Sequence, residues 1–422
     1  MKEILLVGIN HKSAPVEIRE RISFPKDSLI TGLNRLREYE TIKGCVILST
    51  CNRVEMYVST NDIERATKEI KEFLADYHKL EENGLDEYLY IMKGEIAIEH
   101  LLKVPSSLDS LVIGEPQVLC QFKDAYNQAL RLKVTDSTLN TLFQKAINIA
   151  KRVREESHIS KGAVSISFVA VELAKEFFRD LKKRKALLIG AGKMSELAAK
   201  HLIENGIKMI YISNRTYEKA VELAKEFNGQ AIPFDETFRF MKDTDIVISS
   251  TFASSIIIKS EDVSRVMEAR DYQPIILIDI AFPRDIDPDV GLIDGVYLYD
   301  IDDLKMVVEK KTRERSKEIK TAEKILSEEL RKVLSWYRSL DIVPTILSLR
   351  DKMEYIRKGA LNKVINKLKS VTPEDRERID YLTRIIVNKI IASPISQLKK
   401  RAETDNGHIY KETFQDLFRL KE

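Results

Sequence analysis

A cysteine lies among polar residues at the end of an apolar run, in the sequence Ser49-Thr50-Cys51-Asn52-Arg53-Val54-Glu55. The preceding residues 45–48 have the length and branching of a buried strand. The thiolate is the reactive form of cysteine, and the positive charge of Arg53 is expected to lower the pKa of the Cys51 thiol. The pattern is typical of a nucleophile. A small, half-buried structural residue suits the same position.

A second chemical motif is the glycine pair Gly190 and Gly192, between a predicted buried strand (185–189) and a predicted helix (196–205). The first glycine permits a tight turn, and the second lets a pyrophosphate approach the amides of the helix N-terminus. Ser195 stands where glycine or alanine is usual, so strand and helix are expected slightly farther apart. The predicted cofactor loop comprises Gly190, Ala191, Gly192, Lys193, Met194 and Ser195.

The end of the next predicted strand favours NADP over NAD. An acidic residue there would accept a hydrogen bond from the ribose 2′-hydroxyl of NAD, but this chain has Ser213-Asn214-Arg215. An arginine can pair with a 2′-phosphate. We therefore predict that Asn214 and Arg215 contact NADPH. A dinucleotide-type fold without a cofactor is the alternative.

A thiolate and a hydride carrier in one chain indicate a reaction class. The thiolate can attack an activated acyl group and hold it as a thioester while hydride reduces it. The same chemistry in reverse is aldehyde oxidation. Either reaction requires the two motifs to be positioned by separate domains, because the cysteine and the glycine loop are about 140 residues apart.

The sequence predicts an α/β multidomain protein. Three regions that differ in their pattern of helices and strands are expected to position these residues. Residues 1–160 mix strands and helices and form an α+β catalytic and substrate-recognition domain. In residues 161–300, strands at 185–189, 209–213, 245–250 and 275–281 alternate with helices, which predicts a Rossmann-type, doubly wound parallel sheet that binds NADP. Residues 301–422 are predicted all-helical, with one long charged helix over 303–340 and a polar, mobile tail over 401–408.

Composition narrows the class of protein. The 422 residues are 44% hydrophobic and 32% charged, as in a globular protein, and no apolar run approaches the ~20 residues that span a bilayer. Three widely spaced cysteines predict neither a disulfide framework nor a metal site, and suit a cytoplasmic protein without a signal peptide. Residues 301–422 hold 28 Lys and Arg against 20 Asp and Glu, a net +8. This basic region could bind the phosphate backbone of a nucleic acid, or it could be a solvated helical surface.

Several blocks spread over nearly the whole chain carry a family resemblance. They are GINHKSAPVEIRE (8–20), LSTCNRVE (48–55), SLDSLVIGEPQVLCQFKDAY (107–126), AVSISFVAVELAKE (163–176), LLIGAGKMSELAAKHL (187–202), ISNRT (212–216) and DIAFPRDI (279–286). In these blocks the sequence resembles the glutamyl-tRNA reductase family. The resemblance implies NADPH-dependent reduction of glutamyl-tRNA to glutamate-1-semialdehyde, the first step of five-carbon tetrapyrrole (porphyrin) biosynthesis.

The resemblance also implies roles for individual residues. Cys51 would be the nucleophile that attacks the ester between glutamate and tRNA. His100, which on an apolar helix would ordinarily be structural, would be important for activity, in a role that the resemblance does not specify. Substrate recognition would fall to Thr50, Asn52, Arg53, Ser110, Glu115, Pro116, Gln117 and Gln121.

The resemblance extends to partners. It implies a homodimer held by the C-terminal helices and hand-off of the semialdehyde to an aminomutase, with no membrane partner. Cys120 departs from the family, which usually has glycine there, and we expect it to be a buried filler. Two other functions stay open at this point: an NADP-linked dehydrogenase of a small aldehyde or acid that needs no tRNA, and a dinucleotide-sensing scaffold that dimerises.

Overall fold

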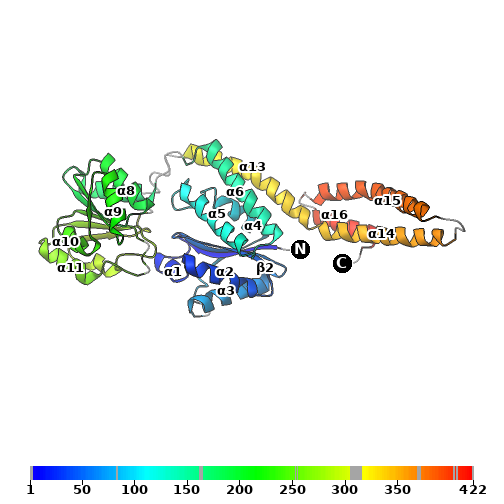
Figure 1. The fold of residues 1–422 in the computed structure, drawn as a ribbon, viewed down its shortest axis with the longest axis horizontal. Coiled ribbons are helices and arrows are strands. Elements are labelled where there is room, and N and C mark those ends of the chain that lie inside the picture. Colours follow the sequence, from blue (N-terminus) through cyan, green and yellow to red (C-terminus); the bar gives the residue numbers. More distant parts are fainter. Residues whose placement is uncertain are drawn as a thin grey trace. The chain divides into compact units, whose positions relative to one another are not determined.

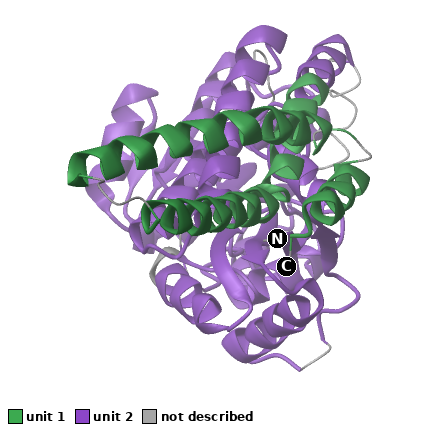
Figure 2. Ribbon diagram, turned by 90° about the vertical axis from the view of Figure 1, so that its right-hand side faces the viewer, with its two compact units in different colours: residues 1, 327–422 green, residues 2–326 purple. Residues whose placement is uncertain are grey.

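The computed structural model describes residues 3–81, 84–160, 165–251, 253, 255–304, 316–367, 372–402, 404 and 407–420. It divides into two compact units, residues 2–326 and residues 327–422 with Met1 (Figure 2). None of the helices in these described ranges is both long enough and apolar enough to cross a membrane.

The N-terminal half of the larger unit is built on an antiparallel sheet in the order β2-β3-β1-β4. Helices α2 and α3 cover one face, and α4, α5 and α6 the other (Figure 1). Central strand β3 is buried along its whole length. The elements are β1 (Glu3–Asn10), α1 (Val16–Arg21), α2 (Lys26–Glu38), β2 (Ile42–Ser49), β3 (Arg53–Thr60), α3 (Ile63–His78), β4 (Tyr90–Lys93), α4 (Gly94–Lys103), α5 (Pro116–Arg131) and α6 (Ser137–Ser157).

The second half of this unit is a parallel six-stranded sheet in the order β10-β9-β8-β5-β6-β7, as predicted for a Rossmann-type domain. Apolar residues alternate between its two faces: Leu188 packs on one side, and Leu187 and Ile189 on the other. The elements are α7 (Ile166–Phe178), β5 (Lys185–Ile189), α8 (Lys193–Glu204), β6 (Met209–Ser213), α9 (Tyr217–Glu226), β7 (Gln230–Ile232), η1 (Phe234–Glu236), α10 (Thr237–Met241), β8 (Ile246–Ser249), α11 (Ser260–Ala269), β9 (Ile275–Asp279), η2 (Pro288–Leu292) and β10 (Val296–Tyr299).

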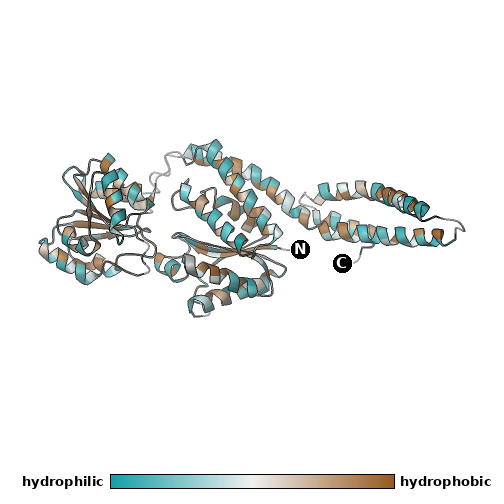
Figure 3. Ribbon diagram, viewed as in Figure 1, coloured by the Kyte–Doolittle hydropathy of each residue, from teal (hydrophilic) through white to brown (hydrophobic). Residues whose placement is uncertain are grey.

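The smaller unit is helical, as predicted. It holds the end of α13 (Ser316–Leu340) together with α14 (Val343–Ile365), α15 (Pro373–Ala402) and α16 (Gly407–Phe418). The buried residues of α15 all lie between Ile391 and Ala402, so no residue in the first half of that helix is buried within the described part of the chain. Apolar residues nevertheless recur along α14 and α15 (Figure 3).

Part of one predicted helix lies outside the described residues, namely positions 305–315 of the helix predicted over 303–340. The mobile tail predicted over 401–408 is wrong at both ends. Helix α15 continues to Ala402, and α16 begins at Gly407.

Candidate active site

The turn between β2 and β3 holds Cys51. The Thr50 hydroxyl accepts hydrogen bonds from the amides of Asn52 and Arg53, both at 3.2 Å, which closes the backbone into a tight turn. The amide of His11 donates to the carbonyl of Asn52 at 2.9 Å, so the loop after β1 braces the same turn. Cys51 is half-buried at the tip. Two motifs that are distant in sequence therefore fix the backbone at the cysteine.

Arg53 begins β3, and its buried side chain lies in a cluster of charged groups. Its Nη1 donates to Oε1 of Glu55 at 2.6 Å and to Oδ2 of Asp109 at 3.2 Å. Its Nη2 donates to the carbonyl of Asp109. The guanidinium predicted to take part in substrate recognition is thus already paired with two carboxylates of the protein.

Glu55 is the centre of this cluster. Oε1 lies 2.8 Å from Nε2 of His100 and accepts from the Tyr90 hydroxyl at 2.5 Å, while Oε2 accepts from the Tyr57 hydroxyl at 2.6 Å. Burial alone would raise the pKa of Glu55, but Arg53 and His100 hold it well below its usual value. His100 is therefore a member of a buried ionic network.

The environment of Cys51 differs from the one expected from its sequence. Burial raises the pKa of the Cys51 thiol to about 12, and the charge of Glu115 raises it further. The positive charge that opposes this shift belongs to Arg19, which donates to the carbonyl of Cys51. The expectation that Arg53 lowers this pKa is wrong, because Glu55 and Asp109 take up its guanidinium.

Glu115 precedes α5 and is buried. It occupies the N-cap position, but its carboxylate accepts no capping hydrogen bond from the helix. Burial raises the pKa of Glu115 to about 7. The charge of this carboxyl group acts on the Cys51 thiol, which makes Glu115 a candidate for proton exchange with it.

Other predicted substrate-binding residues divide by exposure. Asn52 and Ser110 are buried, and Oδ1 of Asn52 and Oγ of Ser110 have no hydrogen-bond partner among the described residues. Buried polar atoms without partners are costly unless a ligand satisfies them. Pro116 and Gln117 are exposed, and Gln121 is half-buried. Cys120 is exposed on α5, so its prediction as a buried filler is wrong.

The glycine loop fits a dinucleotide. Gly190 has a φ of +109°, and a Cβ there would lie 2.3 Å from the carbonyl oxygen of Ser250. Gly192 is the N-cap of α8, whose first turn holds Lys193, Met194 and Ser195, and Ala191 is half-buried beside it. Ser195 is buried, and its Oγ has no partner within the described structure. The loop thus presents helix amides and one buried hydroxyl at the carboxyl end of β5.

The end of β6 separates a structural residue from two accessible ones. The Ser213 hydroxyl lies 2.8 Å from the hydroxyl of Thr237 and is buried. Asn214 donates to the carbonyl of Thr216 at 2.9 Å, and Arg215 is exposed. The exposed guanidinium could pair with a cofactor phosphate.

One buried cluster joins the two motifs. Val16, Leu111 and Val112 of the N-terminal half belong to the same apolar cluster as residues of the parallel sheet. Cys51 packs against this cluster, as do Ala191 and Met194 of the glycine loop. The thiol and the loop therefore border one core.

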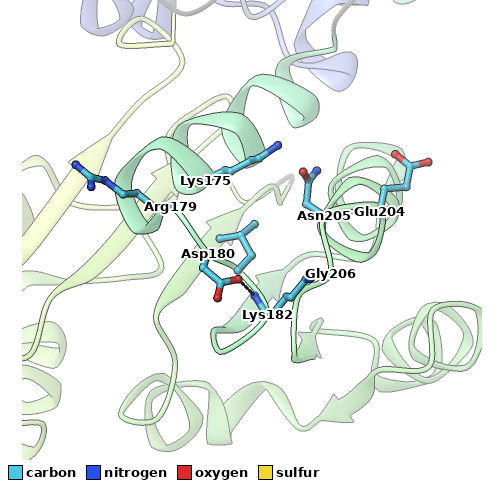
Figure 4. Close-up of a pocket in the computed structure, with 8 residues that line it drawn as sticks. Lys175, Arg179, Asp180, Lys182, Glu204, Asn205 and Gly206 are labelled. Carbon is cyan, nitrogen blue, oxygen red and sulfur yellow. Dashed lines mark hydrogen bonds between the residues drawn. The ribbon is translucent and has the colours of Figure 1, made fainter.

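A separate hollow of about 350 Å³ lies in the parallel-sheet region, where α7 and α8 end (Figure 4). Its charged lining includes Lys175, Arg179 and Glu204. Because β5 and β6 begin there, the hollow is at the sheet edge opposite the glycine loop. It is not part of the site at Cys51.

Sequence reasoning missed Glu55, Tyr57, Tyr90, Asp109 and Arg19. A signal existed for two of them: Arg53, Glu55 and Tyr57 alternate along β3, which places their side chains on one face of the strand. Tyr90, Asp109 and Arg19 come from other elements and reach the site only through the tertiary fold.

Three family models match the chain: the N-terminal domain of glutamyl-tRNA(Glu) reductase over residues 7–157, shikimate/quinate 5-dehydrogenase over 172–307, and the dimerisation domain of glutamyl-tRNA(Glu) reductase over 321–420. Glutamyl-tRNA reductases of Geobacter metallireducens and Geobacter sulfurreducens are 45% and 44% identical over 418 residues, covering 99% of this chain and 96% of each relative. The solved glutamyl-tRNA reductase of Methanopyrus kandleri is 32% identical, with a TM-score of 0.51 over 100% of both chains.

Proposed function

This chain belongs to the glutamyl-tRNA reductase family, and we propose that it reduces glutamyl-tRNA to glutamate-1-semialdehyde with NADPH, through a thioester on Cys51. This would be the first step of five-carbon tetrapyrrole synthesis. The observation that carries the proposal is that the thiol and the glycine loop border the same buried cluster. We propose that residues 1–160 hold the nucleophile and recognise substrate, 161–300 bind NADPH, and 301–422 dimerise.

The first step forms a bond from Sγ of Cys51 to the acyl carbon and breaks its bond to the terminal ribose oxygen of tRNA, which leaves as a hydroxyl. With a thiol pKa of about 12, the proton must move during the attack. Glu115 is the acceptor that we assign, because it is a buried carboxylate whose charge acts on the Cys51 thiol and whose pKa of about 7 leaves a substantial ionised fraction at neutral pH. It then gives this proton to the ribose oxygen as that oxygen leaves. Bound NADPH would supply the hydride that replaces sulfur on the acyl carbon, which releases the aldehyde and the Cys51 thiolate.

Substrate binding is assigned to the residues around the turn. Oδ1 of Asn52 and Oγ of Ser110 are buried and lack partners among the described residues, so they are suited to bind polar groups of the glutamyl moiety. Arg53 would bind the substrate carboxylate by exchanging it for Asp109. His100 would keep Glu55 and Arg53 in place. Thr50 would shape the turn, and Glu115, Pro116, Gln117 and Gln121 would complete the recognition surface.

Binding of NADPH is assigned to residues 190–195 with Asn214 and Arg215. The close approach of Gly190 to the Ser250 carbonyl and the exposed position of Arg215 support this. We expect Arg215→Ala to raise KM for NADPH at least tenfold and to leave KM for NADH within twofold, because only NADPH carries the 2′-phosphate. Arg265→Ala, an exposed arginine of α11, is the control. Equal KM changes for both cofactors would contradict the assignment.

We propose that the chain forms a homodimer, passes its product to an aminomutase and works in the cytoplasm. The match to a dimerisation domain and the exposed apolar residues of α14 and α15 support a homodimer. The reactive aldehyde product favours hand-off to an aminomutase. A cytoplasmic location suits free thiols.

The assay that tests the function combines purified protein, glutamyl-tRNA and NADPH. We expect semialdehyde to form and Cys51→Ser to reduce its rate at least a thousandfold. Product formation by Cys51→Ser at the wild-type rate would eliminate the thioester mechanism. Oxidation of a small aldehyde that survives nuclease treatment, with no semialdehyde from glutamyl-tRNA, would instead identify an NADP-linked dehydrogenase.

A further inference from the structure

Helix α1 contacts both the nucleophile turn and the parallel-sheet region, and its Arg19 side chain is fully buried. Each donor group of this guanidinium serves a different segment. Nε donates to the carbonyl of Ala14 at 3.2 Å, Nη1 to the carbonyl of Cys51, and Nη2 to Oδ1 of Asp302 at 2.5 Å. A fully buried arginine is costly unless its donors are all satisfied, so this geometry constrains all three segments.

Asp302 belongs to the segment that follows β10. Its neighbours Ile301 and Leu304 are buried in the cluster that also contains Val16 of α1. The Asp302 amide donates to Oδ1 of Asp300 at 2.8 Å, which holds the local turn. Arg19 therefore connects the backbone of Cys51 to the end of the parallel sheet through one rigid side chain.

A second ion pair joins the same helix to the loop after β9. Arg284 donates from Nη1 to Glu17 at 2.7 Å, and from Nη2 to Glu20 at 3.1 Å. Its backbone amide also donates to Glu20, at 2.7 Å. A carboxylate that binds both the side chain and the amide of one residue fixes that residue in orientation as well as distance.

Two buried carboxylates shape the loop that presents Arg284. Asp279 accepts from the amides of Ala281, Asp285 and Ile286 at 2.8–3.0 Å. Asp285 accepts from the Ser249 hydroxyl at 2.6 Å and the Thr251 amide at 2.9 Å. These bonds give the DIAFPRDI block (279–286) a physical role, which is to hold Arg284 toward α1.

We propose that Arg19 is a positioning residue that, together with Arg284, ties the Cys51 turn to the cofactor-binding region and so decides whether the thioester is reduced or hydrolysed. The inference rests on the proposed function for its chemistry. Reduction needs the acyl carbon beside the cofactor loop, while hydrolysis needs only water, which replaces sulfur on that carbon and gives glutamate and the free thiol. Loss of either contact, Arg19 with Asp302 or Arg284 with Glu17 and Glu20, should shift the product from semialdehyde to glutamate.

The test uses Asp302→Asn combined with Arg284→Gln, in a Cys120→Ser background that removes the exposed thiol. The control combines Asp303→Asn, the same charge change one residue away, with Arg265→Gln. In reactions with glutamyl-tRNA and NADPH, we expect the test variant to raise the ratio of glutamate to semialdehyde at least fivefold. Its release of the glutamyl group without NADPH should stay within twofold of the control. A parallel fall in both activities, with an unchanged product ratio, would overturn the proposal.

A readout independent of turnover is the rate at which iodoacetamide alkylates Cys51, followed by peptide mass spectrometry. Freeing the ties should expose Cys51 and raise this rate at least fivefold, while buried Cys45 reports any general unfolding. Equal Cys51 rates in test and control variants would overturn the structural tie. If wild-type protein makes no semialdehyde, the proposed function fails. The alkylation rates would still show whether Arg19 and Arg284 hold the Cys51 turn against the cofactor-binding region. Arg19→Lys should behave as the test variant does, because one ammonium cannot reproduce the three-way fork.

Discussion

Glu55 accepts hydrogen bonds from Arg53, Tyr57 and Tyr90, and His100 lies within hydrogen-bond distance of it, all inside the protein. A buried carboxylate is tolerated only when such partners replace water. The network fixes the start of β3, and with it the turn that carries Cys51. Activity lost on mutation of His100 would thus follow from a displaced Arg53 as readily as from lost proton transfer.

We predict that Glu55→Gln destabilises the fold by about 3–5 kcal/mol, because it leaves the buried Arg53 guanidinium with only Asp109 as a counter-charge. Urea unfolding at pH 7 measures the change. The control is Glu64→Gln, whose carboxylate pairs with Lys93 and is 84% exposed, and which should cost less than about 1 kcal/mol. Equal effects of the two substitutions would contradict the importance of the buried network.

Glu115 should make stability depend on pH. Because its pKa is raised from 4.5 to about 7, the folded state binds this proton more tightly than the unfolded state. The associated stability is present below pH 4.5 and is lost as the pH rises through about 7. Glu115→Gln cannot titrate and so lacks this loss. As the pH rises from 4.5 to 7, the free energy of unfolding of the variant, measured relative to that of wild type, should therefore increase by up to about 3 kcal/mol. Urea titrations at pH 5 and pH 8 measure it.

The matched control for this prediction is Glu99→Gln on α4, whose carboxylate pairs with Lys103 and whose side chain is 42% exposed. Its difference from wild type should be the same at both pH values. A pH-independent difference for Glu115→Gln would show that the buried carboxyl keeps an ordinary pKa, and would remove it as the proton acceptor for Cys51.

Residue-level prediction from the sequence succeeded where a motif is local and failed where charge is shared across elements. The turn at Cys51 and the glycine loop are each contiguous, and both lie where they were expected. Arg53 is close to Cys51 in sequence, but its guanidinium pairs with Glu55 and Asp109, and the proximity in sequence did not indicate this. Arg19, from a different helix, is the cation that contacts the nucleophile turn.

At the scale of elements, the strands that sequence reasoning missed lie at sheet edges. Strands β4, β7 and β10 are three or four residues long and are each only partly buried. A half-exposed edge strand lacks the continuous apolar run by which the central strands β5, β8 and β9 were found. The doubly wound class was still predictable, because the central strands and their glycine loop define it.

The glycine loop gives a prediction for a single element. Gly190→Ala should destabilise the parallel-sheet region by at least about 2 kcal/mol, because it combines a positive φ with a clash against the Ser250 carbonyl. Gly359→Ala, in α14 with open space around it, should instead stabilise by up to about 1 kcal/mol. Calorimetric unfolding of both variants checks the signs. A Gly190→Ala protein as stable as wild type would contradict the close approach of Gly190 to the Ser250 carbonyl.

At the scale of the whole molecule, residues 327–422 form a compact unit, and the division falls inside α13. The domain boundary near residue 301 therefore stays a prediction. Tyr381, Leu382 and Ile390 of α15 are each more than half exposed, and the apolar groove between α14 and α15 includes Val364 and Ile386. A second copy of the chain would bury these surfaces.

We predict that Leu382→Glu with Ile390→Glu converts a dimer into a monomer of 48.6 kDa in sedimentation equilibrium, because burying two carboxylates at an apolar interface is costly. Leu292→Glu in η2 is the control, since Leu292 is 83% exposed and lies in the other unit. It should leave the dimer intact. A double variant that remains dimeric would place the interface elsewhere.

The most direct test of the mechanism is peptide mass spectrometry of the protein after incubation with glutamyl-tRNA in the absence of NADPH. The proposed thioester predicts one glutamyl group on the peptide that contains Cys51, none on Cys45 or Cys120, and loss of the adduct with release of semialdehyde when NADPH is added. Cys51→Ala should carry no adduct. Semialdehyde formation by a protein whose Cys51 is never acylated would contradict the thioester.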